Sequence, residues 1–346
     1  MVNLITSVGS RLKKLRVENE YSQRQIAEYL EIDQSNLSKI ENDKRNLNLT
    51  LLDKITNLYN CTPEYLLGES EEYEKIAYKS GKDIDLKAIG KINTLANHLS
   101  ILRKIETEKK TKLPKLNINL RRQFGIDEYS PINIFTLLPT KIDNLTIVWF
   151  PMKKSVNGCC FKNDIDSIIL INSLHPIGRQ NINLAHELYH LLDDAENYIV
   201  CSEKFNDKIE KEADDFASNF LMTNHALYDF IETNDIDEWS VEDVVKYEQY
   251  FQIDHDSLIQ RLNSEKLIDE TQMKEFSSVD IKYKAGRLGY DISLYKASDE
   301  NKDCYSVGHM IPLAEKVCKM GRISIGKRRE ILNDLFRQDI IYKSLR

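Results

Sequence analysis

The sequence predicts a multidomain chain, in which an all-α helix-turn-helix domain is followed by an α+β domain and a mainly helical C-terminal part. Short capped helices alternate with tight turns over residues 10–68. Segments with a β-type pattern lie at residues 145–150, 158–161 and 167–171, and helical patterns fill most of the remaining sequence. We expect domains at residues 1–68 and 115–275, a linker with an amphipathic helix at 69–114, and a C-terminal region of unassigned role at 276–346.

Composition limits the function classes. The 346 residues are 41% hydrophobic and contain only 12 Gly and 7 Pro, which indicates two or three folded domains. Acidic residues outnumber basic ones by 55 to 48, so any DNA contact is confined to one module. Six cysteines without a C-x-x-C pair indicate a reducing cytoplasm, and no apolar run reaches membrane-spanning length. We therefore expect a soluble cytoplasmic protein without a membrane partner.

Capping signals define the first helices. Ser22 is the expected N-cap and Gln25 its capping-box partner, so a helix begins at Gln23. Asp33 repeats the cap, and a second helix runs from Gln34 to about Glu41. Two more helices are expected at residues 49–59 and 63–67. Two short helices joined by a tight turn form the helix-turn-helix arrangement.

The second of these helices carries side chains suited to reading DNA. Glutamine and asparagine make paired hydrogen bonds to adenine edges, while serine, lysine and arginine reach base edges or phosphates. Gln23, at a helix N-terminus, is expected to face a phosphate. The full set of predicted DNA-binding residues is Gln23, Gln34, Ser35, Asn36, Ser38, Lys39, Lys44 and Arg45.

Residues 11–68 resemble the lambda-repressor-like Cro/C1 (XRE) helix-turn-helix family. The resemblance rests on Ser22-Gln23, Ile26-Ala27, the run 37–42, Lys44-Arg45 and the closing run 65–68. Glu31 departs from the pattern, because the family usually has a glycine in that turn. The resemblance implies a homodimer on a double-stranded DNA operator with two half-sites. A small helical protein-interaction domain is the alternative.

The region after this domain predicts a linker and one long helix. Residues 69–78 are acidic and lack apolar periodicity. From Leu86 to Ile105, apolar residues recur at three- and four-residue spacing and make one apolar stripe. We expect this stripe to dock on the following domain, with a dimer seam as the alternative.

The α+β domain contains the motif H-E-x-x-H. His186 and His190 share one face of a predicted helix, so both imidazoles can bind one Zn²⁺ ion, and Glu187 is placed to act as the catalytic base. A third ligand is expected from the helical run 209–222, where Glu212 sits beside the inward face. Spacing alone leaves Glu210, Asp214 and Asp215 as competitors to Glu212.

Residues 115–269 resemble the ImmA/IrrE family of zinc metallopeptidases, which have a zincin-like fold. The matching segments are the strand 167–172, the run 183–190, the run 212–222 and the segment 251–262. The resemblance implies that His186, His190 and Glu212 hold the zinc, and that Glu187 is the catalytic residue. It also implies that the strand 167–172 is the edge on which an extended substrate pairs.

Two departures from the family lie near this motif. Tyr189 replaces a glycine, and either crowds the cleft or donates a hydrogen bond to an oxyanion; Thr223 replaces a proline. His175 and His225 are candidate auxiliary donors, although an ordinary surface or core role is the stronger interpretation of each.

Together the modules predict a DNA-binding transcriptional regulator with a zinc-dependent endopeptidase domain. The resemblance implies a repressor protein as the substrate, and cleavage of the chain itself within the linker is the second version. The alternative is a non-catalytic regulator whose metallopeptidase-like domain is a sensor or a partner-binding module.

Overall fold

The computed structural model describes residues 7–70, 85–106, 120–192, 198–202, 208–299 and 303–343. Two compact units are present among them: residues 7–70 with 85–97, and the described residues from His98 onward. Most of the predicted linker at 69–78 and the predicted boundary near residue 114 lie outside the described residues. None of the described helices is both long and apolar enough to span a bilayer.

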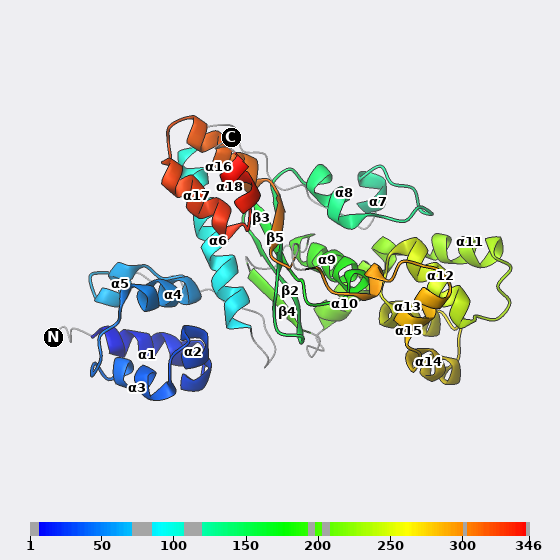
Figure 1. The fold of residues 1–346 in the computed structure, drawn as a ribbon, viewed down its shortest axis with the longest axis horizontal. Helices are drawn as coiled ribbons and strands as arrows, with labels where there is room; N and C mark the ends of the chain where they lie inside the picture. Colours follow the sequence, from blue (N-terminus) through cyan, green and yellow to red (C-terminus); the bar gives the residue numbers. More distant parts are fainter. Residues whose placement is uncertain are drawn as a thin grey trace. The chain divides into compact units, whose positions relative to one another are not determined.

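The first unit contains the predicted helices. They are α1 (Val8–Glu18), α2 (Gln23–Leu30), α3 (Gln34–Glu41), α4 (Leu49–Tyr59) and α5 (Pro63–Leu67) (Figure 1). The Ser22–Gln25 capping box is present. Asp33 occupies the N-cap position of α3, but within the described residues its side chain makes no capping hydrogen bond. Glu31 ends α2 in the left-handed region at φ 58°, a conformation that glycine adopts more readily. The turn thus forms despite the departure from the family.

A buried ion pair joins the helices of this unit. The Arg16 guanidinium donates to Glu41 through Nε at 2.6 Å and Nη2 at 3.1 Å, and the Glu41 side chain is fully buried. Gln23 Nε2 donates to the same carboxylate at 2.8 Å. The start of α2 and the end of α3 are therefore held together by Glu41.

The predicted long helix is α6 (Leu86–Ile105). Its first part packs in the first unit, where Asn93 Nδ2 donates to the Asn57 and Leu58 carbonyl oxygens at 2.8 and 3.2 Å. Residues from His98 onward belong to the second unit. We expected the apolar stripe of this helix to pack on the following domain. Its second part, from His98, does so, whereas its first part packs in the first unit.

The second unit is built on a five-stranded sheet of order β4-β2-β3-β1-β5. Its strands are β1 (Leu145–Phe150), β2 (Val156–Lys162), β3 (Ser167–Asn172), β4 (Tyr198–Ser202) and β5 (Tyr305–Gly308). Among the described strands, β1 and β3 pair in parallel and the other neighbouring pairs are antiparallel. Because β3 is hydrogen-bonded to β2 on one side and β1 on the other, it has no free edge, and the prediction that residues 167–172 form the substrate-binding edge is wrong.

The candidate site lies on helices next to this sheet. Helix α9 (Ile177–Leu192) packs on β2 and β3 and against α10 (Lys208–Leu221). Further helices are α7 (Leu120–Gln123), α8 (Ile134–Lys141), α11 (Asn224–Thr233), α12 (Val241–Phe251), α13 (His255–Ser264), α14 (Glu270–Ser277) and α15 (Ile281–Arg287). Figure 1 shows α11 to α15 gathered at one end of this unit, beyond α9 and α10.

The C-terminal part contributes a strand as well as helices. This part is mainly helical, as predicted, and its strand β5, which was not predicted, pairs antiparallel with β1 at the edge of the sheet. The 3-10 helix η1 (Ser293–Tyr295) precedes it, and α16 (Met310–Lys319), α17 (Ile325–Asp334) and α18 (Gln338–Lys343) follow. The chain beyond residue 276 is thus part of the second unit.

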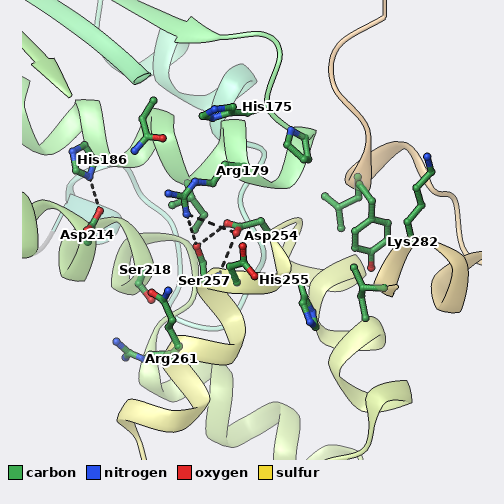
Figure 2. Close-up of a pocket in the computed structure, with 18 of the residues that line it drawn as sticks. His175, Arg179, His186, Asp214, Ser218, Asp254, His255, Ser257, Arg261 and Lys282 are labelled. Atoms are coloured by element: carbon green, nitrogen blue, oxygen red, sulfur yellow. Dashed lines mark hydrogen bonds and ion pairs between the residues drawn. The ribbon is translucent and has the colours of Figure 1, made fainter. Parts of the chain in front are cut away.

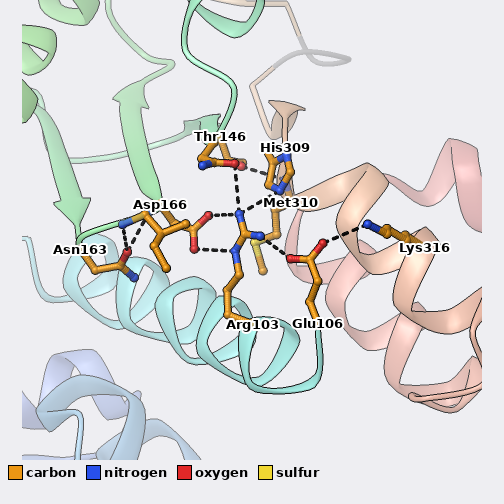
Figure 3. Close-up of polar contacts among 10 residues, drawn as sticks. Arg103, Glu106, Thr146, Asn163, Asp166, His309, Met310 and Lys316 are labelled. Carbon is orange, nitrogen blue, oxygen red and sulfur yellow. Dashed lines mark hydrogen bonds and ion pairs between the residues drawn. The ribbon is translucent and has the colours of Figure 1, made fainter. Parts of the chain in front are cut away.

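Arg103 ties the end of α6 to this unit (Figure 3). Its guanidinium donates to Asp166 through Nε at 2.8 Å and Nη2 at 2.6 Å, and the Asp166 side chain is fully buried. It also contacts Glu106, which accepts from Lys316 Nζ at 3.2 Å on α16. His309 faces the same guanidinium at 3.1 Å, and burial together with the Arg103 charge lowers its pKa.

Candidate metal centre

The H-E-x-x-H motif lies on the buried face of α9. His186 is 4% exposed, Glu187 0% and His190 1%, because the helix is covered by the sheet and by α10. Four residues of helix place the two imidazoles on one face, and their Nε2 atoms are 3.2 Å apart.

Three side chains converge on one point. The Glu210 carboxylate lies 3.2 Å from His186 Nε2 and 3.5 Å from His190 Nε2. Ligand atoms bound 2.0–2.1 Å from a tetrahedral zinc ion are about 3.3 Å from one another. The spacing of these donors therefore fits Zn²⁺, and the set of two imidazoles and one carboxylate is the chemistry that zinc accepts at a catalytic site.

The structure brings Glu210 to the histidines instead of Glu212. The Glu212 side chain is 48% exposed, accepts a hydrogen bond from the Tyr189 hydroxyl at 3.0 Å and lies 3.5 Å from Lys208 Nζ. The reason is the rotation of α10. Ala213 and Ala217 are fully buried, which turns Glu210, one turn earlier, towards His186 and His190 and turns Glu212 away from them.

Asp214, which the sequence offered as an alternative third ligand, contacts the outer nitrogen of His186. Its carboxylate accepts from His186 Nδ1 at 2.8 Å, which directs His186 Nε2 towards Glu210 and His190. Burial alone would lower the pKa of His186, but the hydrogen bonds to Asp214 and Glu210 raise it to about 10. Glu210 and Asp214 are spaced i, i+4 on α10, as the histidines are on α9, and this spacing is the signal that could have identified them.

Glu187 lies against the sheet next to these ligands. A Cβ atom on Gly158 would come within 2.8 Å of Glu187 Oε1 and 2.8 Å of the Leu170 carbonyl oxygen. Gly158 therefore leaves the space in β2 that the Glu187 carboxylate occupies. Burial raises the pKa of the neighbouring Cys160 thiol well above its ordinary value, and the Glu187 charge adds to this effect.

Other predicted residues have ordinary roles. The Tyr189 hydroxyl is hydrogen-bonded to Glu212. His175 is buried, with Nδ1 3.0 Å from the Asn183 amide and Nε2 2.9 Å from the Lys154 carbonyl oxygen. His225 is exposed and pairs with Glu128 at 2.9 Å.

A cavity of about 900 Å³ opens beside the metal residues. His186, Glu210 and Asp214 line one end, and α13, α15 and η1 supply the far wall. Figure 2 shows His186 and Asp214 facing one another at one side, with Arg179, Asp254 and Ser257 in the middle. An extended segment of another chain has room to lie along it.

Apart from Gln23 at the start of α2, the predicted DNA-binding residues lie on and after α3. Gln34, Ser35, Lys39, Lys44 and Arg45 are exposed, and Asn36 and Ser38 are half-buried. Arg45 Nη1 donates to Asn36 Oδ1 at 2.8 Å, which joins a predicted base reader to a predicted phosphate contact. The Gln23 amide donates to Glu41 at 2.8 Å, and Gln23 is half-buried at the start of α2.

Comparison with known proteins agrees with this organisation. The family model described as helix-turn-helix matches residues 12–66, and the model of the IrrE N-terminal-like domain, Peptidase_M78, matches residues 150–263. The chain therefore belongs to the XRE-type helix-turn-helix DNA-binding regulators and carries, fused to that domain, an IrrE/ImmA-like peptidase domain. No solved structure matches the chain.

The similar curated proteins match 65 to 69 residues of this chain. The HTH-type transcriptional regulator ImmR of Bacillus subtilis (strain 168) is 44% identical over 69 residues, 20% of this chain and 54% of ImmR. Control protein C.MunI of Mycoplasma sp is 38% identical over 65 residues, 18% of this chain and 88% of C.MunI. The HTH-type transcriptional regulator RamB of Mycobacterium tuberculosis (strain ATCC 25618 / H37Rv) is 36% identical over 66 residues, 19% of this chain and 14% of RamB. The chain spans about half of ImmR and a small part of RamB.

Proposed function

We propose that this protein is a transcriptional regulator whose second unit is a zinc-dependent endopeptidase that cleaves a repressor protein. The observation that carries the proposal is the spacing of three donors on two helices. Imidazole nitrogens of His186 and His190 and a carboxylate of Glu210 lie 3.2–3.5 Å apart, as ligands of one tetrahedral ion do.

Each residue of the proposed metal centre has its own role in peptide hydrolysis. His186, His190 and Glu210 would hold Zn²⁺, which when bound polarises a scissile carbonyl and lowers the pKa of water. Asp214 accepts from His186 Nδ1 and fixes the ring so that Nε2 faces the ligand set. Glu187, the neighbour of His186 on α9, takes a proton from the attacking water and returns it to the leaving amine. Burial of Glu187 keeps its carboxylate in place beside β2.

The peptidase is tested by comparing the wild type with Glu187→Gln, which keeps all three proposed ligands. Each form is produced in host cells, and new protein N-termini are identified by mass spectrometry. We expect termini that depend on Glu187, within a helix-turn-helix protein or within this chain. Zinc content measured in parallel controls for metal loss. Identical sets of termini from the two zinc-loaded proteins would refute the peptidase proposal and favour a sensor or partner-binding role.

The first unit would bring this activity to DNA as a homodimer on two half-sites. We assign base contacts to Gln34, Ser35 and Asn36 on α3, with Ser38 beside them. We assign phosphate contacts to Lys39, Lys44 and Arg45 near the same helix, and to Gln23 at the start of α2. Gln34→Ala should weaken operator binding by about 1–3 kcal/mol, whereas Lys14→Ala, on exposed α1, serves as the matched surface control. Equal affinities of the two variants, measured by fluorescence anisotropy, would contradict the assignment.

A further inference from the structure

The cavity beside the metal residues is rich in carboxylates. Six carboxylates and three guanidinium or ammonium groups line it. The carboxylates are those of Glu210, Asp214, Asp215, Asp254, Asp256 and Asp280. A dication at the proposed metal centre would be more than neutralised by the carboxylates of Glu187, Glu210 and Asp214, three negative charges against two positive ones. The charge of the remaining wall is therefore set by the other four carboxylates and the three cations.

Two of those cations are already paired. Arg179 Nη1 lies 3.8 Å from Asp254 and 3.4 Å from the Ser257 hydroxyl, and these contacts appear in the middle of Figure 2. Arg261 Nη2 lies 3.3 Å from Glu265, which does not line the cavity, and donates to Asn219 at 2.6 Å. The third, Lys282, is exposed.

The unbalanced charge of the wall is therefore negative. Asp215 on α10 and Asp256 on α13 are both exposed, and Asp280 accepts from the Tyr283 backbone N–H at 3.0 Å as the N-cap of α15. Against these three carboxylates the cavity lining sets one exposed ammonium, that of Lys282. A cavity with low-dielectric walls and an excess of one charge concentrates ligands of the opposite charge.

The wall also offers a hydrogen-bond acceptor. Asn157, on β2, lines the cavity and is 6% exposed, and among the described residues its Oδ1 atom has no hydrogen-bond partner. A buried amide oxygen without a donor carries a free-energy cost that a hydrogen bond removes. The donor that this oxygen lacks is one that an extended segment supplies, because every residue except proline carries a backbone N–H.

We propose that this cavity selects extended peptide segments that carry lysine or arginine side chains. The inference rests on the proposed peptidase function and adds the chemical class of its substrate. It suits a repressor as substrate, because DNA-binding proteins must present lysine and arginine to phosphates. Asp215 and Asp256 are the side chains that we assign to cation recognition, and Asn157 is assigned to the peptide backbone.

The test measures binding separately from cleavage. The full-length Glu187→Gln protein, loaded with zinc, is titrated with a fluorescein-labelled alanine/serine peptide carrying several lysines and with its glutamate counterpart, by anisotropy. We expect the lysine peptide to bind at least tenfold more tightly than the glutamate peptide at low salt, and this ratio of affinities to be smaller at high salt.

The variant with Asp215→Asn and Asp256→Asn, made in the same Glu187→Gln protein, should bind the lysine peptide about two- to tenfold more weakly. Asp229→Asn with Asp237→Asn, two exposed residues that do not line the cavity, should leave that affinity unchanged.

The outcomes separate this inference from the proposed function. Equal binding of the two peptides, preference for the glutamate peptide, or no binding of either would overturn the inference. If the lysine peptide binds selectively but the zinc-loaded wild type cleaves no peptide, the substrate class stands and the peptidase proposal fails. If the wild type cleaves both peptides with equal efficiency, the peptidase proposal stands and the charge selection fails.

Discussion

Asp214 accepts a hydrogen bond from His186 Nδ1 at 2.8 Å, and the opposite nitrogen of the same ring lies 3.2 Å from Glu210. Asp214 and Glu210 are one turn apart on α10, so a single helix supplies both a proposed ligand and the group that orients another ligand. A carboxylate in this position fixes the tautomer of the imidazole and raises its basicity.

Asp214→Asn should therefore weaken zinc binding by about 10- to 100-fold, because loss of such an orienting carboxylate usually has that effect. The dissociation constant is measured by competition with a chromogenic chelator. Asp215→Asn is the matched control, since Asp215 is the next residue on α10 and is exposed. An Asp214→Asn protein with wild-type zinc affinity would show that the hydrogen bond does not support a metal ligand.

Gly158→Ala should lower peptidase activity by at least about tenfold while zinc remains bound, because the new Cβ would displace the Glu187 carboxylate from its present position. Activity, zinc content and circular dichroism are measured together, since the Leu170 carbonyl oxygen is also close. Gly326→Ala is the control, because its Cβ would meet Ser324 Oγ at an ordinary 3.6 Å. Full activity of a folded Gly158→Ala protein would mean that the Glu187 position is not critical.

Arg103→Met should destabilise the second unit by about 3–5 kcal/mol, because it leaves the fully buried Asp166 carboxylate without its charged partner. Chemical denaturation monitored by tryptophan fluorescence measures the change. Adding Asp166→Asn should restore part of the loss, since the unpaired buried charge is then removed. If the double variant is no more stable than the single one, the ion pair does not account for the effect.

His255 should make stability depend on pH. Its Nδ1 lies 2.6 Å from Glu248 and its Nε2 3.0 Å from the Phe276 carbonyl oxygen, so both nitrogens face acceptors. Burial lowers the pKa of His255, but the Glu248 hydrogen bond and charge outweigh it and raise the pKa above 6.5. Tyr295 donates to the other Glu248 oxygen, and Asp254 and Asp256 are the neighbouring acids.

A raised histidine pKa stabilises the folded state fully below pH 6.5, and this contribution disappears as the pH rises through the folded-state pKa. Burial also raises the pKa of Glu248, and this shift has the same sign of pH dependence. His255→Gln should therefore lower Tm most on the acidic side of 6.5, with a difference from the wild type that shrinks on the alkaline side. His225→Gln, at an exposed position, is the control. A difference that grows with pH would contradict this account.

The features that could be predicted from the sequence are those encoded locally. The cap at Ser22 and the apolar spacing of α6 predicted helices that the structure confirms. The strands β4 and β5 were missed, because short strands are recognised by their partners and β5 pairs with β1 some 160 residues earlier in the chain. The same limitation explains why β3 was expected at an edge, since strand order is a property of the assembled sheet.

The candidate site shows the same division between local and tertiary information. The H-E-x-x-H spacing identified His186, Glu187 and His190, because i, i+4 on a helix is a local relationship. The choice between Glu210 and Glu212 depends on how α10 is rotated against α9, which is decided by the burial of Ala213 and Ala217. The contribution of Gly158 depends on a contact between strand and helix and has no local signal.

The most direct test of the central claim is the zinc content of purified wild type, Glu210→Gln and Glu212→Gln proteins, measured by elemental mass spectrometry after removal of loosely bound metal. The account predicts about one zinc per chain for the wild type and for Glu212→Gln, and a large loss for Glu210→Gln, because Glu210, unlike Glu212, lies beside both His186 and His190. Loss of zinc from Glu212→Gln with retention by Glu210→Gln, or a folded wild type that binds no zinc, would contradict the proposed metal centre.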